Sequence, residues 1–260
     1  MHIHRTWTGE YWFALSNLIK KDFRVRYRNM SLGILWSLVN PIVMMGVLTF
    51  VFTKVFPNEA VKGNFGLFVL CGLLPFNFFS IAWSSSTTSL LDNMNLVKRV
   101  AIPRELFPIA AVLGNCVHLA IQIVLLLAVA CLVGPGPNLY WLWLPVVLVL
   151  EVILISGLGL IFSALDVFIR DMRYVVESTT TVLFWLVPVI YPFSVIAPEY
   201  REIYLYNPIA ALVMAVRNII LESQAPAASL LIKLFLSSFL LLGLGFVCFR
   251  RLQRRFYEYL

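Results

Sequence analysis

Residues 109–133 read IAAVLGNCVHLAIQIVLLLAVACLV, a run that contains no Asp, Glu, Lys or Arg. A helix needs about 20 consecutive apolar residues to cross a bilayer. Comparable stretches lie on both sides of this run, so we predict an all-α integral membrane protein with six transmembrane helices. The predicted spans are Ile34–Phe56, Phe65–Leu91, Ile109–Val133, Tyr140–Leu165, Val175–Ile196 and Ser229–Phe249. We expect kinks or partial unwinding in the first span at Pro41 and in the fifth at Pro188 and Pro192.

The composition excludes most other classes of protein. The 260 residues are 61% hydrophobic and 13% charged, whereas soluble domains average about 45–50% apolar and about 25% charged residues. An aromatic content of 14% also excludes a disordered chain. The four cysteines lie far apart in apolar runs without C-x-x-C spacing, so we predict neither a metal site nor a redox site.

Basic residues gather beside the ends of the predicted spans and predict the topology. Most of the 20 Lys and Arg residues fall on one side: Arg5, Lys20, Lys21, Arg24, Arg26, Arg28, Lys98, Arg99, Arg104, Arg170, Arg173, Arg250, Arg251, Arg254 and Arg255. The positive-inside rule then places both termini in the cytoplasm. The net charge of +7 is explained by topology and membrane lipid, so it does not indicate nucleic-acid binding.

We predict a single transmembrane domain over residues 1–260. Two of its helical segments, Trp7–Phe23 and Ile209–Leu221, are not expected to cross the membrane. Residues 1–30 hold an amphipathic helix, Trp7–Phe23, and a basic segment; residues 31–249 form the six-span bundle; residues 250–260 are a basic tail. The apolar spacing of Trp7–Phe23 suits a helix in the cytoplasmic membrane interface, and packing on a protein partner is the alternative. Between spans five and six, Ile209–Leu221 is apolar but too short to span, which predicts a re-entrant or interfacial helix.

Chemistry-bearing motifs are missing from the sequence. We find no metalloprotease, serine-hydrolase or Walker A pattern, and we assign no catalytic residue and no metal ligand. The pairs Gly157/Gly159 and Gly243/Gly245 lie within apolar spans and indicate close helix packing. Glu151 is the one acid deep in a predicted span; a functional carboxylate and a neutral, packed one are equally open.

Two groups of residues suggest contacts with partners. The inner loops Asp92–Glu105 and Asp166–Tyr174 alternate in charge, as do short helices that dock on proteins, although solvation is the ordinary role of any one charge. Aromatic residues are abundant in spans one, two and five. Membrane-belt and packing roles compete with a conduit whose flat aromatic faces stack on sugar rings.

In order along the chain, eight segments resemble the permease subunits of ABC-2-type exporters, in the branch that exports O-antigen, capsular polysaccharide or teichoic acid. They are FRVRYR (23–28), LGILWSLVNP (32–41), GLLPFNFF (72–79), NLVKR (95–99), PRE (103–105), RD (170–171), PVIY (188–191) and NP (207–208).

This resemblance implies a homodimer that encloses a path for a lipid-linked glycan or polyol phosphate, with two ATP-binding subunits bound on its cytoplasmic side. It implies that ATP and Mg are bound by that partner, with no cofactor in this chain. The implied coupling residues are Lys98, Arg99, Arg104 and Glu105 in the main segment and Arg170 and Asp171 in the second. For the conduit we choose Trp36, Phe76, Trp83, Tyr191 and Phe193.

The sequence thus predicts an ATP-driven polysaccharide export permease of the bacterial inner membrane, not itself an enzyme. Three alternatives stay open: an ABC-2-type exporter of drugs or small lipids, a membrane-embedded enzyme acting on lipid-linked sugars, and a structural membrane protein. The enzyme would require clustered acids or a His–Asp set at one face, whereas Glu151 stands alone.

Overall fold

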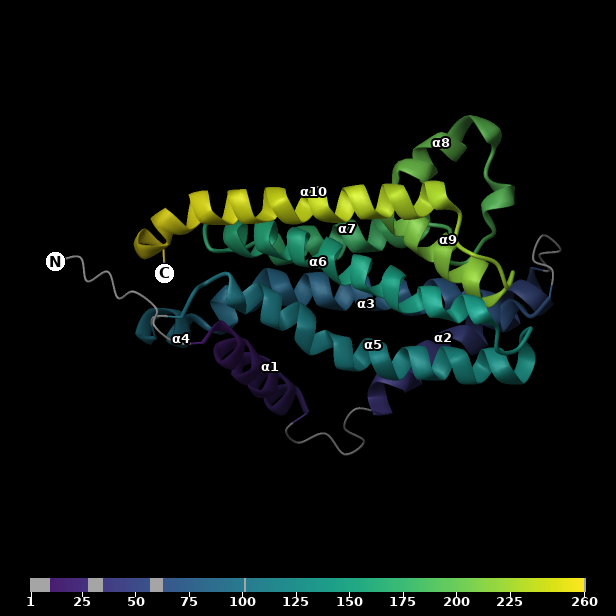
Figure 1. Cartoon of the computed structure of the whole chain (residues 1–260), viewed down its shortest axis with the longest axis horizontal. Helices are drawn as coiled ribbons and strands as arrows, with labels where there is room; N and C mark the ends of the chain where they lie inside the picture. The colour runs from purple at the N-terminus through teal and green to yellow at the C-terminus, as the bar shows by residue number, and fades with distance from the viewer. Residues whose placement is uncertain (1–9, 28–34, 57–62, 101, 260) are drawn as a thin grey trace.

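The computed structural model describes residues 10–27, 35–56, 63–100 and 102–259, and every regular element in these ranges is helical (Figure 1). The elements are α1 (Tyr11–Tyr27), α2 (Trp36–Phe50), η2 (Val51–Val55), α3 (Phe65–Asp92), α4 (Met94–Arg99), α5 (Leu106–Val133), η3 (Leu139–Trp143), α6 (Leu144–Asp166), α7 (Met172–Leu186), η4 (Phe193–Val195), α8 (Pro198–Tyr206), α9 (Pro208–Ile220), α10 (Ala228–Leu252) and η5 (Gln253–Glu258).

Five helices are long and apolar enough to cross a bilayer: Trp36–Val55, Phe65–Asp92, Leu106–Val133, Leu139–Asp166 and Ala228–Phe256. They correspond to predicted spans one, two, three, four and six, which are confirmed as helices. The first runs through Pro41 without a break, and its irregularity lies instead in the π-helical turn η2.

The fifth predicted span, Val175–Ile196, was wrong as a single membrane-crossing helix. Helix α7 has 15 residues and ends at Leu186; at about 1.5 Å per residue it falls well short of a bilayer core. Val187 adopts φ −84° and ψ 140°, because a residue that precedes proline is pushed out of the helical region. The unwinding expected at Pro188 and Pro192 is confirmed, and it continues to the short turn η4.

A bent helix pair follows this irregular segment. Helices α8 and α9 meet at 97° and pass the length and composition test for a span only together. The side chain of Asn207 accepts a hydrogen bond from the Ile209 N–H at 3.0 Å, and Pro208 occupies the first turn of α9, where its missing N–H costs nothing. The helix expected at Ile209–Leu221 is therefore confirmed, shifted by one residue, while its place relative to the membrane stays a prediction.

Helix α3 is the centre of the bundle. It packs on α5 and α6 most extensively and also contacts α2, α7 and α9 (Figure 1). Its span is 83% buried, against 22% for α5 and for α10. The side chain of Asn64 begins the helix by accepting a hydrogen bond from the Leu67 N–H at 3.1 Å. Because α3 touches so many neighbours, a polar face on it must meet another helix or a cavity.

Glycines allow α6 and α10 to lie in close contact. A Cβ atom at Gly157 would stand 2.5 Å from the backbone carbon of Leu241, and one at Gly245 would stand 2.6 Å from the Gly157 carbonyl oxygen. At Gly243 a Cβ atom would meet nothing within 4 Å. The packing role expected of Gly157 and Gly245 is confirmed, and no such contact exists at Gly243.

We expect Gly157→Ala to destabilise the protein by about 1–3 kcal/mol, since the added methyl group must separate two helix backbones. Gly243→Ala is the matched control and should gain slightly from the better helix propensity of alanine. Thermal unfolding of both variants in the same detergent measures the difference. Equal midpoints for the two variants would contradict the glycine contact.

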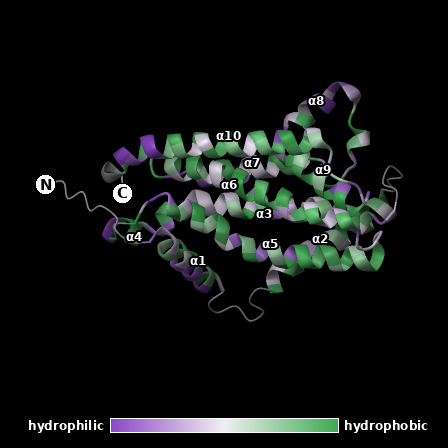
Figure 2. Ribbon diagram, viewed as in Figure 1, coloured by the Kyte–Doolittle hydropathy of each residue, from purple (hydrophilic) through white to green (hydrophobic). Residues whose placement is uncertain are grey.

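The N- and C-terminal helical segments gather with α4 at one end of the bundle, which we call the basic end (Figures 1 and 2). Helix α1 buries Ala14 and Leu18 against this end and leaves Trp12 76% exposed. The ammonium group of Lys21 donates to the Asn93 side chain, between α3 and α4. The predicted amphipathic helix is thus confirmed from Tyr11 onward; Trp7 lies outside the described residues. One face packs on its own chain, and the aromatic face stays open.

Candidate functional site

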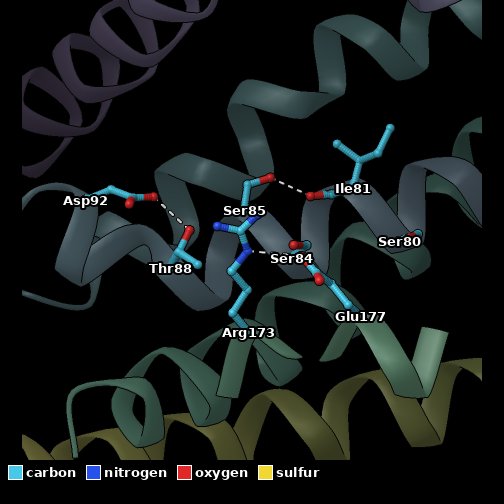
Figure 3. A pocket seen from close by; sticks show the side chains of 8 residues that line it. All are labelled: Ser80, Ile81, Ser84, Ser85, Thr88, Asp92, Arg173 and Glu177. Atoms are coloured by element: carbon cyan, nitrogen blue, oxygen red, sulfur yellow. Dashed lines mark hydrogen bonds and ion pairs between the residues drawn. The ribbon is translucent and has the colours of Figure 1, made fainter. Parts of the chain in front are cut away.

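A polar groove runs along α3, between α3 and α7, with α2 at its far end. It consists of two cavities that share Ser80. The hydroxyl cavity, about 440 Å³, is lined by Ser80, Ile81, Ser84, Ser85, Thr88, Asp92, Arg173 and Glu177 (Figure 3). The aromatic cavity, about 280 Å³, is lined by Asn40, Met44, Leu73, Phe76, Asn77, Ser80, Thr180, Thr181, Phe184 and Trp185.

The hydroxyl cavity lies toward the basic end and holds the charges of the groove. The guanidinium Nε of Arg173 donates to Glu177 at 2.9 Å, one turn along α7. This hydrogen bond raises the pKa of Arg173 above its ordinary value. On α3 the Thr88 hydroxyl donates to Asp92 at 2.7 Å. Figure 3 shows both pairs turned toward the same space.

The aromatic cavity continues the groove away from the basic end. The rings of Phe76 and Phe184 meet edge to face with centroids 5.4 Å apart, and Phe184 meets Trp185 at 5.5 Å. Trp185 is 63% exposed. Two amides, from Asn40 of α2 and Asn77 of α3, join this lining. The cavity therefore offers flat apolar faces together with donors and acceptors that carry no charge.

Helical spacing explains why these polar groups share one groove. On α3, Ser80, Ser84 and Thr88 are four residues apart and so lie on one face. On α7, Arg173, Glu177 and Thr181 follow the same spacing. Our sequence analysis missed both stripes. The signal was present in two runs of hydroxyl residues within apolar segments, 84–89 (SSSTTS) and 178–181 (STTT).

The residues chosen for the conduit have different surroundings. Phe76 lines the aromatic cavity. Trp83 is 4% exposed and packs on Phe79 and Phe162, so in this structure it is a packing residue. Trp36 is exposed on α2 and Phe193 is partly exposed on η4; neither lines the groove. Their roles in a path stay predictions.

Tyr191 supports the wall of the groove from the irregular segment after α7. Its hydroxyl lies 2.9 Å from the carbonyl oxygen of Trp185 and 3.2 Å from that of Leu186, the last carbonyls of the helix. These carbonyls have no partner within α7, because the helix stops at Leu186. Tyr191 thus caps the helix end that carries Trp185, and it does not itself line either cavity.

Arg217 on α9 holds the same irregular segment, and the sequence analysis gave it no role. Its Nη2 donates to the Val189 carbonyl at 2.6 Å and its Nη1 to the Tyr191 carbonyl at 3.4 Å. The guanidinium lies 3.6 Å from the centre of the Phe68 ring. Only 6% of the residue is exposed. Arg217 therefore binds the backbone freed by Pro188 and Pro192 and joins α9 to the end of the groove.

The residues predicted to couple to a motor lie at the basic end. Lys98 and Arg99 are exposed in the last turn of α4, and Arg170 and Asp171 are exposed between α6 and α7. Glu105 is half-buried.

Arg104 is different, because it also contacts the C-terminal segment. Its Nη1 donates to the Gln253 carbonyl at 3.4 Å, and its guanidinium lies 5.7 Å from the centre of the Phe256 ring. The coupling roles stay predictions. Arg104 has in addition a visible structural contact.

Glu151 lies apart from the groove. It is fully buried in α6, and neither carboxylate oxygen has a hydrogen-bond partner among the described residues. An unpaired charge in such surroundings is costly. The geometry therefore favours the neutral, packed alternative over a functional carboxylate.

These observations define a class: a multi-pass helical membrane protein with a polar groove beside its central helix and a basic end bearing exposed short helices. Within the described residues no group of three His, Cys, Asp or Glu side chains could hold a metal ion. The sequence pattern of the family described as "ABC-2 type transporter" matches residues 14–221, and the chain belongs to this family.

Three relatives are similar over nearly their whole length. The O-antigen export system permease protein RfbA of Klebsiella pneumoniae is 30% identical over 244 residues, covering 94% of this chain and 93% of the relative. The protein of the same name from Myxococcus xanthus is 29% identical and covers 96% of each chain. The polysialic acid transport protein KpsM of Escherichia coli is 25% identical, covering 90% of this chain and 91% of its own.

Proposed function

We propose that this chain is the transmembrane permease subunit of an ATP-driven exporter that moves a lipid-linked polysaccharide of O-antigen, capsule or teichoic acid type from the cytoplasmic side across the inner membrane. The observation that carries the proposal is the groove along α3, which combines hydroxyl, amide and aromatic side chains beside a helix long and apolar enough to cross a bilayer. Polar groups are costly there unless they serve a path or a partner. Membership of the ABC-2 type transporter family and the names of the relatives support the same reading.

The energy source is a separate chain. Two ATP-binding subunits, which bind ATP and Mg, dock on the basic end of two copies of this permease; this chain itself holds no cofactor. Both termini lie in the cytoplasm, as the positive-inside rule requires. Support for this arrangement comes from the exposed charges on α4 and between α6 and α7, which lie at one end of the bundle. Closure of the motor subunits would shift the bundle between two packings.

Reversal of charge at both Lys98 and Arg99 is expected to weaken binding of the ATP-binding subunit about tenfold or more, because both side chains are exposed in the last turn of α4. Co-purification of the two subunits measures the effect. Lys54, an exposed basic residue of η2 outside the basic end, is the matched control, and the chain should bind the subunit normally after the same reversal there. Unchanged co-purification of the Lys98/Arg99 variant would remove α4 from the interface.

The proposed function predicts polymer on the cell surface only when the permease and its ATP-binding subunit are both present. The test uses cells that synthesise a lipid-linked polysaccharide and lack their own permease, with surface polymer measured by antibody. An ATP-binding subunit unable to hydrolyse ATP is the control and should leave the polymer inside. Absence of surface polymer, together with ATP-dependent efflux of dyes or phospholipids, would favour an exporter of drugs or small lipids.

A further inference from the structure

We propose that the groove selects an uncharged, hydroxyl-rich sugar chain and rejects polyanionic chains. This inference rests on the proposed export function and narrows its substrate class to neutral O-antigen or capsule polymers, which leaves out polyanionic chains such as teichoic acids. It comes from two properties of the groove: the balance of its charges, and the balance between hydrogen-bond donors and acceptors on its lining.

The lining of the groove carries a net negative charge. Arg173 is the one cation among the lining residues, and Glu177 neutralises it at 2.9 Å. Asp92 adds a second carboxylate, and the aromatic cavity contributes no charged group. Asp92, Arg173 and Glu177 are exposed, so a polymer with an acidic group on each sugar would meet this net negative charge along the open wall of the groove. A neutral sugar meets no such barrier.

Three hydroxyl groups of the lining, those of Ser85, Thr88 and Thr181, present lone pairs rather than protons. Thr88 donates to Asp92 at 2.7 Å and Ser85 donates to the Ile81 carbonyl (Figure 3). Thr181 donates to the Glu177 carbonyl at 2.9 Å. Each of these hydroxyls has a single proton and has already used it. Together with the carboxylates, they make this part of the groove rich in acceptors.

Acceptors discriminate between the two classes of polymer. A sugar hydroxyl donates a proton to an acceptor, whereas an ionised carboxylate or phosphate diester offers only lone pairs. An anionic chain would therefore face unpaired acceptors as well as like charge. The amides of Asn40 and Asn77 can both donate hydrogen bonds to sugar hydroxyls and accept hydrogen bonds from them. The exposed ring of Trp185 offers an apolar face to a sugar ring.

The charge balance can be measured with a single cysteine in the groove. Ser84→Cys is prepared in the full-length permease with its ATP-binding subunit in lipid nanodiscs, and it is treated with cationic or anionic methanethiosulfonate reagents of similar size. We expect the cationic reagent to react about tenfold faster than the anionic one, after correction for their reactivity with a free thiol. The unsubstituted chain, with its four native cysteines, gives the background.

Neutralisation of the lining is the matched control. In the Asp92→Asn/Glu177→Gln background, Arg173 is left unpaired, so the preference should fall and then favour the anionic reagent. Unlabelled sugar oligomers test the substrate class in the same assay. A neutral glucose heptamer should protect the thiol introduced by Ser84→Cys from both reagents, whereas a sialic acid heptamer should protect it only in the neutralised background.

Equal or better protection by the sialic acid heptamer in the Ser84→Cys chain would overturn the proposal, as would a preference for the anionic reagent. Neither result would contradict the proposed export function, because that function is tested separately by the amount of polymer on the cell surface. The two proposals can also fail in the opposite order. If the cells show no surface polymer while the cationic reagent still reacts faster, the proposed function is wrong, and the measured charge of the groove still stands.

Discussion

Ser84→Trp is expected to reduce polysaccharide export to about 1% of the wild-type level or less, equivalent to a loss of about 2.7 kcal/mol in the rate-limiting step. Ser84 lies on the α3 wall of the hydroxyl cavity, whose volume is about 440 Å³. An indole there occupies the space through which the proposed function routes the sugar chain. The measurement is surface polymer in the cell assay, normalised to the amount of permease in the membrane.

The control for this prediction is Ser178→Trp. Ser178 is an exposed hydroxyl residue of α7 that does not line the groove. It should retain export within about threefold, since surface substitutions away from special features change stability by about 0.5 kcal/mol or less. Binding of the ATP-binding subunit should be normal in both variants. Export by Ser84→Trp at the level of Ser178→Trp would show that the substrate does not use the groove.

The sequence predicted most of the fold because its strongest signals are long and local. An apolar run such as 109–133 decides a helix by itself, and α5 ends at Val133 as expected. Asn207-Pro208 similarly fixes the first turn of α9 through one side-chain hydrogen bond and one preset backbone angle. These features depend on neighbours a few residues away, which a single sequence contains.

The fifth span shows where such signals fail. Hydropathy over Val175–Ile196 counts apolar side chains and takes no account of backbone hydrogen bonds. Val187 leaves the helix ahead of Pro188, and the carbonyl of the fully buried Val189 then needs a donor. That donor is Arg217, 28 residues from Val189. A contact over this distance has no signature in spacing or composition.

The groove was missed for a related reason. The spacing of Ser80, Ser84 and Thr88 predicts a polar face on α3, but it does not say which helix that face meets. The answer is α7, whose Glu177 and Thr181 follow the same spacing. Aromatic residues were the weaker guide, because Phe76 lines the groove whereas Trp83, another aromatic residue two turns further along the same span, fills the core.

Arg217→Leu is expected to cost about 3 kcal/mol or more and to lower the unfolding midpoint by about 6–12 °C. The substitution leaves the Val189 and Tyr191 carbonyls without their donor; Val189 is fully buried, and an unpaired buried carbonyl is costly. Arg217→Lys should restore only part of the loss, because one ammonium group cannot span both carbonyls while lying on Phe68. Thermal unfolding in detergent and the amount of protein in the membrane measure both effects.

Arg201→Leu provides a matched comparison, because Arg201 also donates to two backbone carbonyls, those of Ile196 at 2.8 Å and Ser194 at 2.9 Å. Arg201 is only half-buried, so water can replace its hydrogen bonds, and we expect a loss below about 1 kcal/mol. Equal shifts for the two leucine variants would mean that burial of the freed backbone does not decide the cost. In that case the hydrogen bonds of Arg217 would stabilise the protein no more than those of Arg201, and apolar contacts would account for the order of the irregular segment beside the groove.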